Sequence, residues 1–144
     1  MSNTVLQPLI TLLTARSPLY DGIYQLKQNR ITSLDLSHQS LECNDVVKMA
    51  AALKKNTSLK ELDLSNNNIS NVGALALATA ITNHANLQFL DLEKNAICLT
   101  GANALLAAVQ KNSSFQFLEL QGNPVNAATL AALETLLTPR SLWY

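Results

Sequence analysis

The chain has 144 residues, of which 48% are hydrophobic and 14% are charged, against about 25% charged in an average domain. Ten basic and ten acidic residues give a formal net charge of zero, so no overall field draws the chain to nucleic acid or to an anionic membrane. Two cysteines are too few for a disulfide scaffold, and no apolar run reaches the ~18 residues of a membrane span. We therefore expect a soluble, cytoplasmic, single domain covering residues 1–144.

The first thirty residues have two segments with helical spacing of apolar side chains. Residues 4–15 carry Val5, Leu9, Leu12 and Leu13, and Ser17-Pro18 is a helix start that precedes Leu19, Ile23 and Leu26. No basic residue precedes the first segment, so a secretory signal is not expected. We interpret residues 1–30 as a helical N-terminal cap.

From residue 31 onward the chain repeats itself every 28 residues, in four units at 31–58, 59–86, 87–114 and 115–142. Numbering each unit from its first residue, position 4 holds Leu34, Leu62, Leu90 and Leu118, and position 6 holds Leu36, Leu64, Leu92 and Leu120. Position 9 holds Gln39, Asn67, Asn95 and Asn123. A constant period without insertions indicates a stack of equivalent structural units.

Each unit contains a short strand followed by a helix. The alternation at Leu62-Asp63-Leu64 is typical of a strand with one buried face. Further along each unit, apolar residues recur four apart, which is typical of a helix: Met49 and Leu53, Leu77 and Ile81, Leu105 and Val109, Leu133 and Leu137. Stacking the units would give a parallel sheet on one side and helices on the other, with the strands on the concave surface. The asparagine at position 9 is predicted to satisfy backbone groups where the strand leaves the sheet.

The pattern LxxLDLSxNxI, followed by a helix of Ala and Leu with period 28, resembles the leucine-rich repeat of the ribonuclease-inhibitor subtype. Similar repeats occur in the Ran GTPase-activating proteins and in NOD-like receptors. The resemblance covers residues 31–142 and implies an α/β solenoid, here a short right-handed βα arc. It implies little about function, because this architecture serves many functions.

Trp143 falls where a fifth strand would begin, so the C-terminal tail at 143–144 is either a hydrophobic plug on the last unit or the start of a longer array.

Residues suited to catalysis or metal binding are few. The sequence lacks GxGxxG, GxxxxGK[ST], HExxH and CxxC motifs. His38 and His84 have no acidic or nucleophilic partner in their units, and we expect both on the surface. Cys43 and Cys98 lie two units apart, too far for a disulfide, and we expect buried free thiols. We therefore expect no enzyme activity, no cofactor and no metal.

Positions 3, 5 and 7 of each unit alternate with the buried leucines and should face solvent on the concave side. Six of these twelve residues are acidic and none is basic: Asp35, Glu61, Asp63, Asp91, Glu93 and Glu119. Asp at position 5 belongs to the repeat pattern itself, so this acidic surface is either functional or inherited. In-register strands place equivalent side chains ~4.8 Å apart, and repulsion should raise the pKa of carboxyls in the middle of the row, Asp91 among them.

Phe89 and Phe117 occupy the same position in adjacent units and should lie side by side on this surface. Neighbouring exposed aromatic residues are typical of an interface anchor. We predict a monomeric module that binds another protein, one with a basic surface, through Glu61, Asp63, Phe89, Asp91, Glu93, Phe117 and Glu119. Two alternatives stay open, a regulator of a GTPase similar to the Ran GTPase-activating proteins and a bacterial effector secreted into a host cytosol.

Overall fold

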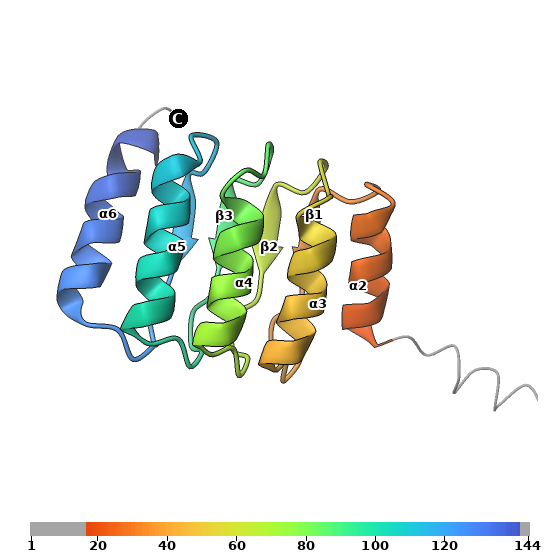
Figure 1. Cartoon of the computed structure of the whole chain (residues 1–144), viewed down its shortest axis with the longest axis horizontal. Coiled ribbons are helices and arrows are strands. Elements are labelled where there is room, and N and C mark those ends of the chain that lie inside the picture. Colours follow the sequence, from red (N-terminus) through yellow and green to blue (C-terminus); the bar gives the residue numbers. More distant parts are fainter. Residues whose placement is uncertain (1–16, 142–144) are drawn as a thin grey trace, which may run out of the picture.

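The computed structural model describes residues 17–141, with side chains up to residue 137. Helices and strands alternate along the chain: α2 (Pro18–Lys27), β1 (Ser33–Asp35), α3 (Cys43–Leu53), β2 (Glu61–Asp63), α4 (Asn71–Ile81), β3 (Phe89–Asp91), α5 (Leu99–Lys111), β4 (Phe117–Glu119) and α6 (Ala127–Ser141). Figure 1 looks onto the layer of helices, with the strands behind it. The predicted helix start is confirmed, since α2 begins at Pro18 and the Ser17 hydroxyl accepts a hydrogen bond from the N–H of Tyr20.

The four strands form one parallel sheet in the order β1-β2-β3-β4. Their register pairs Leu34 with Leu62, Leu62 with Leu90 and Leu90 with Leu118. Paired residues therefore occupy the same position in neighbouring repeats. This register agrees with the constant period, and a slip of one residue in the pairing would turn the leucines of one strand away from the core. The predicted α/β solenoid with parallel strands on one side and helices on the other is confirmed.

The core lies between the two layers. Leu62, Leu90 and Leu118 from the sheet are at most 6% exposed, and all eight residues of the predicted helical stripe are at most 7% exposed. Small residues bring the helices close together: a Cβ added to Gly101 of α5 would lie 2.7 Å from Oδ1 of Asn71 and 2.9 Å from Cβ of Ala74, both on α4. The Asn71 amide oxygen uses this proximity to accept hydrogen bonds from the N–H groups of Cys98 and Gly101.

In the second, third and fourth units, position 9 forms a ladder of buried side-chain amides, as predicted, whereas Gln39 of the first unit is exposed. Asn95 donates to the carbonyls of Leu64 and Leu92 and accepts from the N–H of Ile69, which ties its own unit to the preceding one. Asn67 and Asn123 make the equivalent bonds in their units. The residue before this position has a positive φ in every unit, at His38, Asn66, Lys94 and Gly122. This left-handed residue turns the chain out of the strand and aims the next side chain at the backbone.

A second ladder, which the sequence analysis missed, lies near the ends of α3, α4 and α5. The amide nitrogens of Asn56 and Asn112 donate to the carbonyls of Leu26 and Ile81, and the oxygen of Asn56 accepts from the N–H of Leu59. His84 takes this position in the unit between them and is 4% exposed, so its predicted surface location is wrong. Its Nδ1 accepts from the N–H groups of Asn86 and Leu87, while its Nε2 has no partner among the described residues.

Both cysteines are free, as predicted, but their predicted burial is wrong. Cys43 is half-buried with its Sγ 2.8 Å from Oγ of Ser70, and Cys98 is exposed. Cys43 is the first residue of α3, and Cys98 is the residue directly before α5. Both therefore lie at the ends of helices and not along the buried helical stripe. The helical segment predicted at 4–15 and the tail at 143–144 lie outside the described residues. Among residues 17–141, no helix is long and apolar enough to cross a membrane.

Candidate functional site

The strands bring the predicted site residues together in two rows. One row runs Glu61, Phe89, Phe117, and the other runs Asp63, Asp91, Glu119, each residue paired in register with the next. We call the surface made by positions 3, 5 and 7 of the four units the strand face. Every residue predicted as part of the site lies on this face. Glu93 lies just beyond β3, at position 7 of its unit, two residues after Asp91.

Two phenylalanines form the apolar part of the strand face, on β3 and the edge strand β4. The rings of Phe89 and Phe117 have centroids 6.2 Å apart and planes tilted by 38°. Phe117 is 44% exposed, whereas Phe89 is half-buried, so only the first is as accessible as predicted. Phe117 also borders a hollow of about 280 Å³ between α6 and the segment around β4. This hollow is lined by leucines, among them Leu118 and Leu133, and also by polar residues: Gln116, Glu119, Gln121 and Glu134. The pair therefore offers a partner an exposed aromatic edge beside a hollow with leucine and polar lining.

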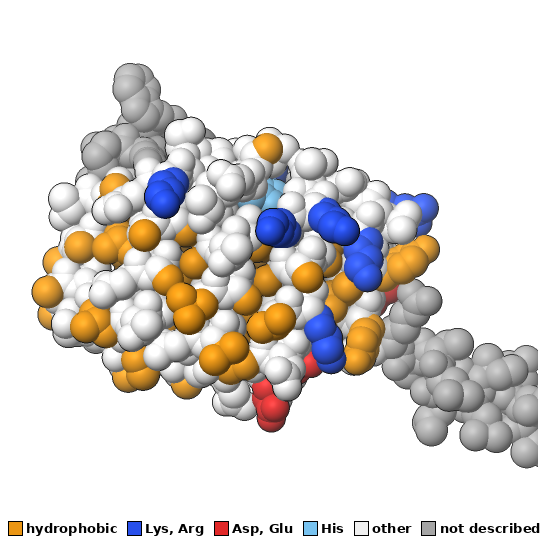
Figure 2. Space-filling model, viewed as in Figure 1, with side chains coloured by type: hydrophobic (Ala, Val, Ile, Leu, Met, Phe, Trp, Pro, Cys, Tyr) orange, Lys and Arg blue, Asp and Glu red, His pale blue; other side chains and the backbone are white. Residues whose placement is uncertain are grey.

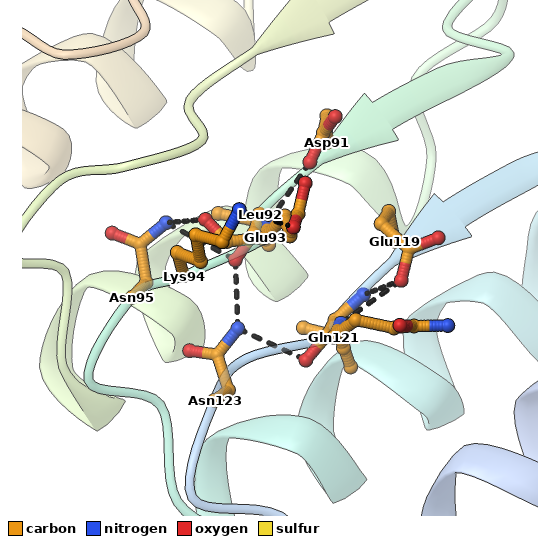
Figure 3. Close-up of polar contacts among 9 residues, drawn as sticks. Asp91, Leu92, Glu93, Lys94, Asn95, Glu119, Gln121 and Asn123 are labelled. Atoms are coloured by element: carbon orange, nitrogen blue, oxygen red, sulfur yellow. Dashed lines mark hydrogen bonds and ion pairs between the residues drawn. The ribbon is translucent and has the colours of Figure 1, made fainter.

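The row of carboxylates has a structural role in addition to its charge. In each unit the position-5 carboxylate accepts a hydrogen bond from the N–H two residues later: Asp35 from Ser37, Asp63 from Ser65, Asp91 from Glu93, and Glu119 from Gln121. Figure 3 shows two of these bonds beside the amides of Asn95 and Asn123. Part of the acidity of this surface therefore stabilises the turn that follows each strand.

The environment shifts the pKa values at the centre and the end of the row in opposite directions. Burial raises the pKa of Asp91 above its ordinary value, and the charges of Asp63, Glu93 and Glu119 add to this shift. At the exposed end, hydrogen bonds from the N–H and hydroxyl of Ser37 lower the pKa of Asp35. The predicted direction for Asp91 is thus confirmed, but burial, and not repulsion alone, is the main cause.

Two acidic residues of the strand face have no such role in their turns. Glu61 is exposed beside the phenylalanines, and no hydrogen bond or ion pair to another described residue holds its carboxylate. Glu93 forms an ion pair with Lys94, at 2.9 Å between Oε1 and Nζ, and the two side chains are 35% and 61% exposed. Because an exposed pair of this kind is worth at most ~1 kcal/mol, a stronger basic partner could displace Lys94.

Other reactive groups of the described chain do not assemble into a metal site. No three His, Cys, Asp or Glu side chains within the described residues lie close enough to hold a metal ion. The hydrogen bond with Ser70 lowers the pKa of Cys43, but the two groups stand apart from the strand face on the helix side of the turn. The strand face therefore combines an aromatic pair with carboxylates, and a hollow of mixed leucine and polar lining lies beside it.

Comparisons with known proteins agree with the repeat architecture. Residues 55–78 match the family model described as "Leucine Rich repeat". A search of curated proteins finds no match. Among solved structures, the chain is similar to leiomodin-1 actin-binding site 2, with a TM-score of 0.73 and 22% identity over 85% of this chain and 73% of that chain. It is also similar to the tropomodulin C-terminal domain of Caenorhabditis elegans, with a TM-score of 0.59 and 12% identity over 83% of this chain and 91% of that chain. At these identities the likeness shows a shared leucine-rich-repeat fold.

Proposed function

We propose that this chain is a non-enzymatic interaction module that binds another protein across its strand face. Phe117 and Phe89 act as the anchor, and Glu61, Asp63, Asp91, Glu93 and Glu119 contact basic groups of the partner. The observation that carries the proposal is the aromatic pair itself, with Phe117 44% exposed on the edge strand β4 beside the carboxylates of the strand face. Packing within the fold does not require a large aromatic side chain to be this exposed. At protein interfaces, a few large residues of this kind contribute most of the binding energy.

The charge of the strand face determines what kind of partner fits. Six carboxylates and no basic side chain occupy its twelve positions, although the whole chain is neutral. Such a surface attracts basic segments and repels acidic ones, which affects the rate of association more than the final affinity. We infer a partner that presents Lys or Arg around an apolar side chain able to enter the hollow beside Phe117.

Selection from a library of random displayed peptides tests this chemistry directly, because the library samples basic, acidic and apolar sequences alike. Peptides enriched on the immobilised chain should carry a net positive charge with an aromatic or aliphatic residue. Their binding should weaken at least ~10-fold, or 1.4 kcal/mol, in Phe117→Ala. The matched control is Leu99→Ala, which removes a side chain of equal 44% exposure from α5 on the opposite layer. Enrichment of acidic peptides, or equal losses in both variants, would contradict the proposal.

Actin is the first protein to test, because the similar leiomodin-1 fragment is named for an actin-binding site. Capture of actin that depends on Phe117 would assign it to the strand face, and capture that survives Phe117→Ala would locate binding elsewhere. The proposal places the chain in the cytoplasm, either of its own cell or, for a secreted bacterial effector, of a host. A GTPase regulator remains the alternative function, and stimulated GTP hydrolysis would support that alternative.

A further inference from the structure

A groove between α2 and α3 lies on the helix layer, apart from the strand face. Its volume is about 560 Å³, and it is lined by Tyr20, Ile23 and Lys27 of α2, by Lys48, Ala51 and Ala52 of α3, and by Lys55, which follows α3. Its floor is apolar, because Ala52 is 3% exposed and Ile23 packs against the core. The two alanines keep the floor low, and the side chain of Tyr20, which is 56% exposed, rises above it. The groove can therefore take an apolar side chain from outside.

The rim of this groove is basic. Three of its lining residues are lysines and none is acidic, and among the described residues none of the three lysines forms an ion pair. The nearest acidic residue along α3 is Asp45, whose carboxylate is already bonded to the N–H of Glu42. Figure 2 shows this layer, on which most of the Lys and Arg side chains in view lie over the right-hand half, where Figure 1 places α2 and α3.

We propose that this groove docks an acidic, amphipathic segment of a second protein. An apolar side chain of that segment enters between α2 and α3, and its carboxylates meet Lys27, Lys48 and Lys55. The sign of the charge is opposite to that of the strand face, so the two surfaces select different partners and the chain can join them. The proposal is independent of the function proposed for the strand face.

The chemistry of the groove favours a protein segment over other anions. A phosphate backbone has no apolar group to fill a groove of about 560 Å³ with an alanine and isoleucine floor. The chain is also neutral overall and carries six carboxylates on the strand face, which disfavours a long polyanion or an anionic membrane. Residues 1–16 contain no acidic residue, so they do not provide the complement that three lysines require.

The test uses a synthetic peptide with Leu and Phe on one helical face and Glu on the other, and a matched peptide in which Lys replaces Glu. Fluorescence anisotropy with the full chain should show binding of the Glu peptide only, weakened by salt because exposed charges are screened. Lys48→Gln with Lys55→Gln should weaken binding at least ~10-fold. The control Lys54→Gln with Lys111→Gln makes the same charge change at exposed lysines that do not line the groove and should leave affinity unchanged.

A second pair of variants tests the apolar floor. Ala51→Gln fills the groove and should weaken binding of the Glu peptide, whereas Ala107→Gln makes the same change at the same repeat position on α5 and should not. All four variants should still bind the basic peptides selected on the strand face, so failure here is distinguishable from failure of the proposed function. The proposal is overturned if both lysine pairs behave alike, or if the groove variants instead abolish binding to phosphatidylserine vesicles or to nucleic acid. It is overturned equally if a photoreactive aromatic side chain in place of Tyr20, which borders the groove, cross-links to residues 1–16 or to a second copy in place of the peptide.

Discussion

His84 is a residue at which the repeat departs from its own pattern. The asparagines in the neighbouring units use their amide nitrogen to bridge to a carbonyl of the preceding unit, whereas Nε2 of His84 is buried without a partner in the described structure. A buried unsatisfied donor costs ~1–3 kcal/mol. His84→Asn should restore the bridge, to the carbonyl of Leu53, and stabilise the fold by about 1 kcal/mol, or about 4 °C in melting temperature. Thermal unfolding measures this, with Asn112→His as the reverse change. A lower melting temperature for His84→Asn would show that packing of the ring outweighs the unpaired donor.

The same residue should make stability depend on pH. Burial lowers the pKa of His84 in the folded chain below its ordinary value of about 6.5. The unfolded chain therefore takes up the proton first as the pH falls. The stability is complete above about pH 6.5 and declines below it, toward the folded pKa. Urea unfolding at neutral and mildly acidic pH should show a smaller decline in His84→Asn, while the exposed change His38→Asn should keep the decline of the wild type.

Asp91 should respond to pH with the opposite sign. Its folded pKa is raised, so the folded chain binds this proton more tightly, and stability falls as the pH rises through the window above about 3.9. Asp91→Asn removes that charge but keeps an oxygen that can accept from the N–H of Glu93. The variant should be more stable by a few tenths of a kcal/mol at neutral pH, because partial exposure limits the effect, and equal to the wild type near pH 3. Asp35→Asn, at a carboxyl whose pKa is lowered, should instead lose stability at neutral pH, and gains in both variants would contradict this account.

At the scale of one strand, neighbouring residues separate stability from binding. Leu90 is 0% exposed in the core, and Phe89 beside it is on the strand face. Leu90→Ala should destabilise the fold by ~2–5 kcal/mol through the cavity it leaves. Phe89→Ala should lower stability by less than ~1.5 kcal/mol, the scale of one aromatic pair, and reduce partner binding. Denaturant unfolding of both variants checks this, and equal losses would show that Phe89 belongs to the core.

Whole elements could be predicted from the sequence because the period repeats the same evidence four times. The strand register, the helical stripe and the asparagine ladder all follow from positions 28 residues apart. A residue that breaks the period is harder to predict. The burial of His84 was missed because the neighbouring units have asparagine at this position, and the signal was its alignment with Asn56 and Asn112. The hydrogen bonds that Asp63 and Asp91 accept in their turns were predictable from the sequence. An Asp side chain at the end of a strand commonly accepts from the backbone N–H two residues later.

At the scale of the whole molecule, the solenoid separates two surfaces of opposite character. The sheet carries the carboxylates and the phenylalanine pair, and the helix layer carries the lysine-rimmed groove between α2 and α3. The net charge of zero does not indicate either surface, because acidic and basic residues cancel in the sum although they occupy different positions of each unit. The groove also depends on α2, which precedes the first strand and departs from the repeat pattern, so repeat positions alone could not predict it.

The location of the partner is the central claim, and nuclear magnetic resonance tests it most directly. Amide signals of the isotope-labelled chain would be followed while a basic peptide selected on it is added. Binding across the strand face predicts that the largest shift changes cluster in β2, β3 and β4 and the turns after them, at Glu61, Asp63, Phe89, Asp91, Glu93, Phe117 and Glu119. Shift changes confined to the helices α2–α6, with those strands unaffected, would contradict the claim.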